Sequence, residues 1–161
     1  MLFRSANMLA GQKVDIVRST VVGDRDVLTE WAPPVLHPER VKEYRIMRSS
    51  GDNNFTEVAR VPAGVHMYTD SDVDVHKTEY FYRISIITDC DLIGEQSNQS
   101  SSIYLQSKYD YNNFKSTLWW TPYNQWDTGV DHYDIEKLNS NGTWELIRTV
   151  NGNTLESNFD E

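Results

Sequence analysis

The chain has 161 residues, of which 39% are hydrophobic, 24% charged and 12% aromatic, and these proportions are ordinary for a globular protein. Its formal net charge of -9 at pH 7 repels phosphate backbones, so we expect no nucleic-acid partner. No apolar stretch approaches the roughly 18–20 residues that cross a bilayer, so we expect no membrane insertion. The single cysteine, Cys90, excludes an internal disulfide framework, and its residue type favours burial as a small apolar side chain.

Residues 1–12 are interpreted as an N-terminal extension, because their apolar stretch is too short for a signal peptide. After this extension, strand signals recur, whereas the apolar spacing of an amphipathic helix is not found. Extended segments are expected, in chain order, at 15–22, 26–32, 41–48, 55–61, 66–69, 79–88 and 97–106. Segments of this number and length predict two antiparallel sheets packed face to face, with alternate residues of each strand buried.

The sequence then repeats itself at a fixed distance. The matched residues, each pair 89 positions apart, are Trp31 and Trp120, Pro33 and Pro122, Val41 and Val130, Tyr44 and Tyr133, Ile46 and Ile135, and Val61 and Val150. A fixed period of this length indicates tandem copies of one domain. We therefore expect a complete unit at 13–107 and a partial second unit at 108–161, joined near 108–113.

The second unit is expected to lack its last two strands. Its extended segments lie at 114–121, 130–137, 143–150 and 158–161, which leaves no counterpart for 79–88, the most hydrophobic segment of the first unit. Such a unit has an uncovered sheet face and an unpaired strand edge, which favours association with another strand. Residues 1–12, the first unit or a second chain could cover this face, so self-association through the second unit is an expectation.

The core is expected to consist of the inward-facing residues of these segments. In the first unit they are Ile16, Trp31, Tyr44, Ile46, Val58, Val61, Tyr68, Tyr80, Tyr82, Ile84, Ile86, Ile103 and Leu105. In the second unit, the repeat places Trp120 and Tyr133 in the same roles. Apolar burial of this extent drives folding without a metal or a disulfide.

These residues resemble those of the fibronectin type III domain. The resemblance is carried by Trp31 with Pro33, Tyr44-x-Ile46, Tyr68-x-Asp70 and Thr78-Glu-Tyr80-x-Tyr82-x-Ile84, and it covers 13–107 fully and 108–161 in part. It implies an immunoglobulin-like antiparallel β-sandwich with Trp31 in the core. It also implies a corner hydrogen bond from the Tyr80 side chain back to the chain.

A narrower resemblance concerns large bacterial surface proteins. The segment 119–130 with Tyr133 and Asn141-Gly142, and the segments 88–90, 97–98 and 103–105, are similar to repeats of the gliding-motility-associated group exported by type IX secretion. This resemblance implies an extracellular or cell-surface location, with neighbouring repeats of the same protein as partners.

The chain departs from the fibronectin type III pattern at two points. Thr29 stands where the family has an aliphatic residue, whereas the second unit has Leu118 at the matching position. We therefore expect a shifted or bulged strand that turns Leu28 inward in the first unit. No Arg-Gly-Asp sequence occurs, so adhesion of the integrin type has no support.

Two groups of side chains are candidates for binding. Asp70, Asp72 and Asp74 alternate in one loop and could supply oxygen ligands to calcium, although the loop lacks the glycine and the final glutamate of an EF-hand. The alternative is a loop whose carboxylates lie in water.

The second group is aromatic. Trp119, Tyr123 and Trp126 lie close together in the sequence, and because Trp120 takes the core position, Trp119 faces the other side of its strand. Exposed aromatic rings can stack on sugars. The alternative is that these rings pack over the end of the sandwich or at the joint between the units.

No motif gathers the carboxylates and histidines that acid–base catalysis requires, so we expect no enzyme, no catalytic residue and no cofactor. The sequence predicts a structural spacer or adhesion repeat of a large extracellular or cell-surface bacterial protein. Two alternatives stay open: a module that binds glycans or surface proteins through its exposed aromatic rings or a sheet edge, and an accessory domain of a secreted polysaccharide-degrading enzyme.

Overall fold

The computed structural model describes residues 13–126 and 128–160. These residues form antiparallel strands and one short 3-10 turn, η1 (Pro38–Arg40). The chain divides between Tyr104 and Leu105 into two units, and each is described by itself below. The fold is an immunoglobulin-like, fibronectin type III β-sandwich, as the sequence predicts.

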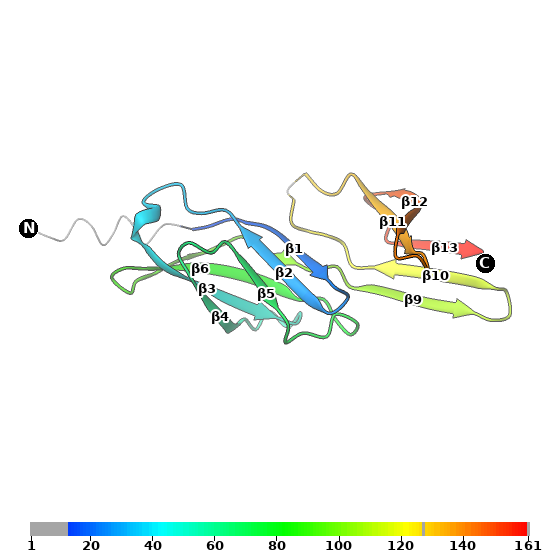
Figure 1. Ribbon diagram of the computed structural model, residues 1–161, viewed down its shortest axis with the longest axis horizontal. Coiled ribbons are helices and arrows are strands. Elements are labelled where there is room, and N and C mark those ends of the chain that lie inside the picture. Colours follow the sequence, from blue (N-terminus) through cyan, green and yellow to red (C-terminus); the bar gives the residue numbers. More distant parts are fainter. Residues whose placement is uncertain (1–12, 127, 161) are drawn as a thin grey trace, which may run out of the picture. The chain divides into compact units, whose positions relative to one another are not determined.

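The first unit is a sandwich of two sheets (Figure 1). One sheet has the order β1-β2-β5, and the other has the order β4-β3-β6-β7, with β8 paired to β6. The strands are β1 (Ile16–Val22), β2 (Asp26–Trp31), β3 (Val41–Ser49), β4 (Thr56–Pro62), β5 (Met67–Asp70), β6 (Phe81–Thr88), β7 (Ile93–Gln96) and β8 (Ser100–Ser101). Because side chains alternate along a strand, each sheet presents one face to the core.

The core between these two sheets is dense with aromatic and branched side chains. Trp31 of β2 contacts Tyr44 of β3 edge-to-face, with ring centroids 5.3 Å apart, and such a pair contributes about 0.5–1.5 kcal/mol beyond area burial. Ile46 and the β6 residues Tyr82 and Ile84 are fully buried. Other expected core residues that are buried or packed against this cluster are Ile16, Val58, Val61, Tyr68, Tyr80 and Ile86.

A buried ion pair links the two sheets, and the sequence did not predict it. Asp70 of β5 is 0% exposed, and both of its carboxylate oxygens accept hydrogen bonds from Arg48 of β3, at 3.0 and 2.9 Å. Tyr82 of β6 donates its hydroxyl to the same carboxylate at 3.0 Å. Burial and the neighbouring Asp70 charge raise the pKa of Tyr82, so its hydroxyl remains a donor.

Tyr80 makes the corner contact that the fibronectin type III resemblance implies. It lies directly before β6, and its hydroxyl accepts a hydrogen bond from the backbone N–H of Asp74 at 2.9 Å. This bond ties the loop between β5 and β6 to the start of β6. The Arg48 guanidinium lies 5.6 Å from the centroid of the Tyr80 ring, so the corner and the buried ion pair adjoin each other.

The second unit repeats the first five strands. Its sheets have the orders β13-β10-β9 and β11-β12, and its strands are β9 (Leu105–Asp110), β10 (Lys115–Trp120), β11 (His132–Leu138), β12 (Trp144–Asn151) and β13 (Glu156–Asp160). Trp120 and Tyr133 contact each other edge-to-face with ring centroids 5.6 Å apart, which reproduces the Trp31–Tyr44 pair of the first unit.

One strand irregularity also repeats, whereas the irregularity of the β1–β2 ladder between Ile16 and Arg18 has no counterpart in the β9–β10 ladder. In the first unit the β3–β4 ladder skips Val58, because Ile46 pairs with Ala59 and Met47 pairs with Glu57. In the second unit the β11–β12 ladder skips Ile147 at the matching position. Within the described residues, the second unit has no counterpart of β6 or β7.

The end of the first unit differs from the sequence prediction. The expected strand at 97–106 is not continuous, and the expected loop at 89–95 contains the start of β7. The reason lies in side-chain hydrogen bonds: the Asn98 amide accepts from Ile16 N at 2.8 Å and donates to Ile16 O at 3.2 Å, which turns the chain toward β1. The small residues of β8 then bridge to β6 for only two residue pairs.

The boundary between the units therefore lies earlier than expected. Leu105 begins β9 and pairs with Trp120 of β10, so the division falls at Tyr104/Leu105 and not at 107/108. The expected core position of Leu105 is wrong, because its side chain is 57% exposed; Ile103 is half-buried. The expected joint at 108–113 is instead the hairpin that connects β9 to β10.

The expected inward turn of Leu28 is also wrong. Val27, Thr29 and Trp31 are the buried residues of β2, and β2 pairs with β5 without a bulge. Thr29 tolerates full burial because its hydroxyl lies 3.0 Å from the hydroxyl of Ser19 on β1, so the two form a hydrogen bond. A satisfied hydroxyl can occupy a position where an aliphatic residue is expected.

Candidate binding surfaces

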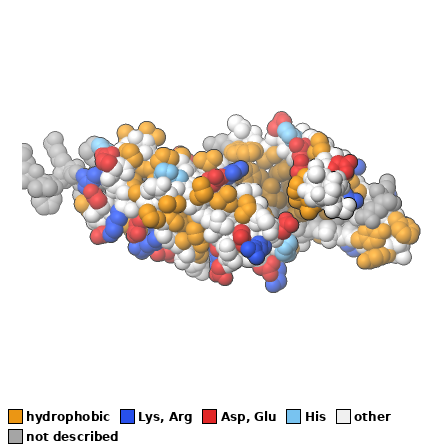
Figure 2. All heavy atoms as spheres, in the orientation of Figure 1, with side chains coloured by type: hydrophobic (Ala, Val, Ile, Leu, Met, Phe, Trp, Pro, Cys, Tyr) orange, Lys and Arg blue, Asp and Glu red, His pale blue; other side chains and the backbone are white. Residues whose placement is uncertain are grey.

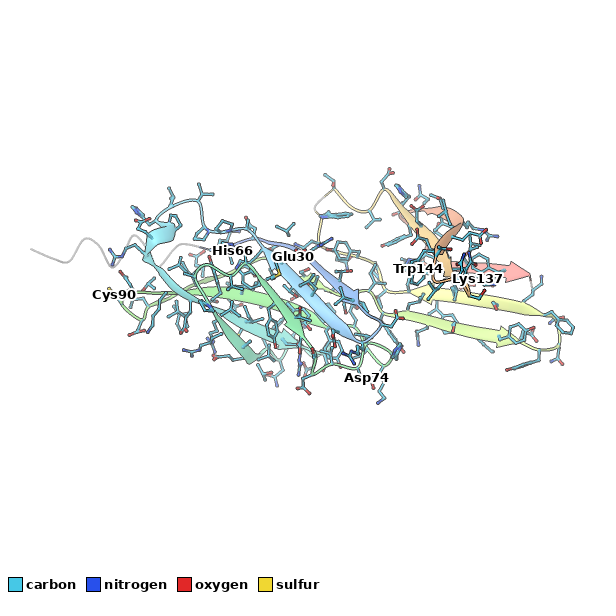
Figure 3. All side chains as sticks on the ribbon, viewed as in Figure 1. Glu30, His66, Asp74, Cys90, Lys137 and Trp144 are labelled. Carbon is cyan, nitrogen blue, oxygen red and sulfur yellow. The ribbon has the colours of Figure 1, made fainter. Side chains whose placement is uncertain are left out.

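The three alternating carboxylates of the first unit do not form one site. Asp70 accepts hydrogen bonds from Arg48 and Tyr82, and the Arg48 guanidinium also lies 3.5 Å from the carboxylate of Asp72, whose side chain is 99% exposed. Asp74 accepts a hydrogen bond from Lys77, with 2.6 Å between its Oδ2 and Nζ, and this contact holds the pKa of Asp74 below its ordinary value. Figure 3 shows the Asp74 side chain at the edge of the unit. The described residues contain no group of His, Cys, Asp and Glu side chains placed to hold a metal ion.

The aromatic set divides into two parts. Tyr123 and Trp126 contact each other edge-to-face, with ring centroids 5.1 Å apart, and Trp126 is 53% exposed. The backbone N–H of Tyr123 donates to the Tyr133 hydroxyl at 3.0 Å, which anchors the loop to β11. Trp119 instead donates its indole N–H to the Gln106 side chain of β9. The structure therefore joins Tyr123 to Trp126 and gives Trp119 a polar neighbour on its own sheet.

A second exposed aromatic group lies at the tip of the β9–β10 hairpin. Tyr109 and Tyr111 contact each other edge-to-face at 4.7 Å, and Tyr111 and Phe114 are 81% and 63% exposed. Figure 2 shows these apolar atoms gathered at the end of the hairpin. These rings are not among the residues expected to bind, although two aromatic residues that flank an Asn-Asn turn are a signal for an exposed aromatic tip.

Cys90 lies on the exposed turn between β6 and β7, so its expected burial is wrong (Figure 3). The turn is polar because Arg40 of η1 reaches it: the guanidinium donates to Asp89 at 2.6 and 2.9 Å. It also donates to the Cys90 sulfur at 3.6 Å. These contacts hold the turn against η1 and leave the thiol at the surface.

The open side of the second unit is the largest difference between the two units. In β12, every residue except Val150 is exposed, and Leu138, Trp144 and Leu146 are each at least half exposed. Tyr133 faces Trp120, so alternation places Ile135 and Lys137 on the inner face and Asp134 and Glu136 on the outer face. Arg148 of β12 crosses this inner face to Ser157 of β13, with 2.9 Å between Nη1 and Oγ.

No protein-family model and no curated protein matches the chain. Among solved structures, the chain is similar to an Fn3-like protein from Clostridium thermocellum, with 16% identity over 56% of this chain and 88% of that chain and a TM-score of 0.47. It is similar to the FN1-FN3 domains of chicken CNTN1, with 12% identity over 94% of this chain and 57% of that chain and a TM-score of 0.49. It is also similar to a β-1,2-glucanase from Parabacteroides distasonis, with 19% identity over 58% of this chain and 12% of that chain and a TM-score of 0.48. Likeness at these identities concerns the fold alone.

A transmembrane helix is not among the elements of the described residues, since none is both long and apolar enough to cross a bilayer.

Proposed function

We propose that the chain is a non-catalytic structural repeat of a large extracellular or cell-surface protein, in which it spaces or presents neighbouring domains. The observation that supports this proposal is the repetition itself: the second unit repeats the first five strands of the first unit, with the same Trp–Tyr core pair. Proteins of the gliding-motility-associated, type IX-exported group are the proposed context, and neighbouring repeats are the proposed partners.

The mechanical side of this proposal is tested by pulling a single molecule of the full chain between handles at its two ends. A spacer repeat should resist force, so the first unit should unfold in one discrete step. The step should release roughly 30 nm of contour length for residues 13–104, at about 3.4 Å per residue. Gradual extension without a resolved step would contradict a role in resisting force.

A second candidate function is glycan binding. It is favoured by the exposed rings of Trp126, Tyr111 and Phe114, because flat apolar ring faces can stack on sugar rings. The experiment is a titration of tryptophan fluorescence with a broad panel of polysaccharides. A saturable change that disappears in Trp126→Ala and persists in Trp144→Ala would support glycan contact at the Tyr123–Trp126 pair. No change across the panel would argue against it.

The accessory-domain alternative predicts that the chain adheres to an insoluble polysaccharide without cleaving it. Pull-down with such a polysaccharide, followed by analysis of the released sugars, distinguishes this alternative from a pure spacer. Retention without sugar release favours the accessory role, and the absence of retention favours the spacer.

A further inference from the structure

Among the described residues of the first unit, Arg83 is the one basic side chain without a carboxylate partner. The other Lys and Arg side chains of this unit each lie at most 3.9 Å from a carboxylate oxygen; they are Lys13, Arg18, Arg25, Arg40, Lys42, Arg45, Arg48, Arg60 and Lys77. Figure 2 shows blue basic and red acidic side chains next to each other over this unit. The charge of Arg83 therefore remains available to a carboxylate from another molecule.

Neutral side chains hold the Arg83 guanidinium in place. Because Tyr82 is a core residue, alternation places Arg83 on the outer face of β6. Its Nη1 donates to Oε1 of Gln96 at 3.1 Å, and its Nη2 donates to Oε1 of Gln99 at 2.8 Å. Its Cζ atom lies 4.3 Å from the centroid of the Phe55 ring. A guanidinium that is fixed in this way loses little further freedom when a ligand binds.

These contacts make the surface around Arg83 rich in hydrogen-bond donors. A guanidinium carries several N–H groups and accepts no hydrogen bond, so Gln96 and Gln99 turn their amide oxygens toward Arg83 and their amide NH2 groups away from it. Within the described part of the chain, the remaining guanidinium N–H groups and the two amide NH2 groups have no acceptor. Donors around a fixed positive charge suit a carboxylate, which only accepts hydrogen bonds when it is ionised.

A strand edge adjoins this group of donors. β7 pairs with β6 through Gln96↔Ser85 and Ile93↔Ile87, and no other described strand pairs with β7. This edge is open although the chain continues from β7 into β8, and Ile93 is 53% exposed. An extended peptide can add to such an edge through its backbone, with one side chain over Ile93 and another directed toward Arg83.

The charge of the first unit favours a peptide with one carboxylate over a polyanion. Residues 13–104 contain 10 Lys and Arg and 15 Asp and Glu, a formal net charge of -5, which repels a polysaccharide with a carboxylate on every sugar. Arg45 and Arg60 on the same outer face do not offset this repulsion, because Glu57 pairs with both of them. A peptide with a single carboxylate is attracted by Arg83 and carries little other charge to be repelled.

We propose that Arg83, Gln96, Gln99 and the edge of β7 bind an extended segment of a partner protein through one Asp or Glu side chain of that segment. The carboxylate accepts hydrogen bonds from the guanidinium and from the two amide NH2 groups, and the backbone of the segment pairs with β7. An aliphatic residue on the same side of the segment covers Ile93. This binding role is separate from the spacer role of the repeat and does not depend on it.

The test uses the full chain, labelled with nitrogen-15, and the capped peptide Thr-Val-Thr-Glu-Thr-Val, which carries its valines and its glutamate on one side when extended. The Nε–H resonance of Arg83 reports the carboxylate contact, and the amide resonances of residues 93–96 report the strand pairing. We expect saturable shifts of both, with a dissociation constant of about 1 mM or below. The matched peptide with glutamine in place of glutamate should bind roughly tenfold more weakly, as the loss of a charge-assisted hydrogen bond predicts.

Three variants of the chain locate the binding. Gln96→Glu gives Arg83 a carboxylate of its own, and Arg83→Gln removes the charge, so each should bind the glutamate peptide roughly tenfold more weakly. Arg60→Gln removes an arginine that already pairs with Glu43 and Glu57, so it should bind the peptide as the unchanged chain does. Amide spectra check that each variant is folded, and Gln96→Glu, an exposed and nearly isosteric change, tests the site if Arg83→Gln does not fold.

Other occupants give different results. Saturation by a galacturonate oligomer that depends on Arg83, without saturation by the peptide, would show a polysaccharide as the occupant and would overturn the proposal. Acetate that shifts the Arg83 resonance at the same concentrations as the peptide would show contact with any free carboxylate, and this too would overturn it. Equal binding of the glutamate and glutamine peptides, or equal binding by Gln96→Glu and the unchanged chain, would have the same consequence.

Discussion

The two units contain the same five strands but bury them to different extents. In β3, the inner residues Tyr44 and Ile46 are 1% and 0% exposed, whereas their counterparts in β11, Tyr133 and Ile135, are only half-buried. The β3–β4 register, its bulge and the Trp–Tyr pair are nevertheless reproduced by β11–β12 and by Trp120 with Tyr133. The local sequence pattern and the pairing of adjacent strands therefore suffice to form these strands. The burial of their inner residues depends on β6, which is remote in the sequence.

The ion pair between the sheets should give the largest effect that is confined to the first unit. Asp70→Ala would leave the mostly buried Arg48 only its contacts with the exposed Asp72, and breaking a buried pair costs about 3–5 kcal/mol. The second unit has Lys137 and Phe159 at the matching positions, so it should be unaffected. Urea unfolding checks this, with the exposed Asp72→Ala as the control, which should change stability by less than about 0.5 kcal/mol. A similar loss in both variants would contradict the role of Asp70.

Two matched substitutions, each of which shortens an isoleucine on the inner face, compare the units directly. Ile46→Ala creates a cavity in a closed core and should cost about 2–5 kcal/mol. Ile135→Ala removes a side chain that is half-buried, so it should cost clearly less. Unfolding followed by hydrogen exchange reports each unit separately. Equal costs would mean that the inner face of the second unit is as well covered as that of the first.

The corner hydrogen bond should have a smaller effect. Tyr80→Phe removes the hydroxyl that accepts from Asp74 N, and loss of one such bond costs about 1 kcal/mol. The cost should be accompanied by faster amide exchange at Asp74, without a change at β10. Unchanged exchange at Asp74 would show that the loop is held by other contacts.

The smallest expected effect concerns pH. Burial raises the pKa of Glu79, and its Oε1 is buried with no hydrogen-bond partner among the described residues. Between the ordinary and the raised pKa, the folded state keeps a proton that the unfolded state releases, so stability falls as pH rises through this window. Glu79→Gln should remove this fall, which thermal unfolding between pH 4 and pH 7 would reveal. Parallel curves for the two proteins would contradict it.

The fold could be predicted from the sequence because strand alternation and repeat spacing are visible in the order of the residues. The alternation of Tyr82, Ile84 and Ile86 predicts β6, and the spacing of Trp31 and Trp120 predicts the repeat. The incorrect predictions for Leu105 and Thr29 have a common origin in contacts between residues that are distant in the sequence. Leu105 is apolar but lies on an exposed position of β9, and Thr29 is polar but buried, because Ser19 on the neighbouring strand satisfies its hydroxyl.

The candidate surfaces could be predicted from the sequence only in part, because they too depend on contacts between distant residues. Trp126 was singled out from its neighbours in the sequence, and its exposure and its contact with Tyr123 are consistent with an available surface ring. The role of Asp70 requires Arg48 and Tyr82 from the opposite sheet, and a linear pattern of aspartates does not show this.

The contact between Arg48 and Asp70 has a consequence for how the first unit responds to shear. The two residues belong to different sheets, so sliding one sheet past the other requires the separation of opposite charges in a medium of low polarity. Ions in solution screen such buried pairs weakly. The resistance of this unit to stretching should therefore be nearly the same in dilute buffer and in concentrated salt.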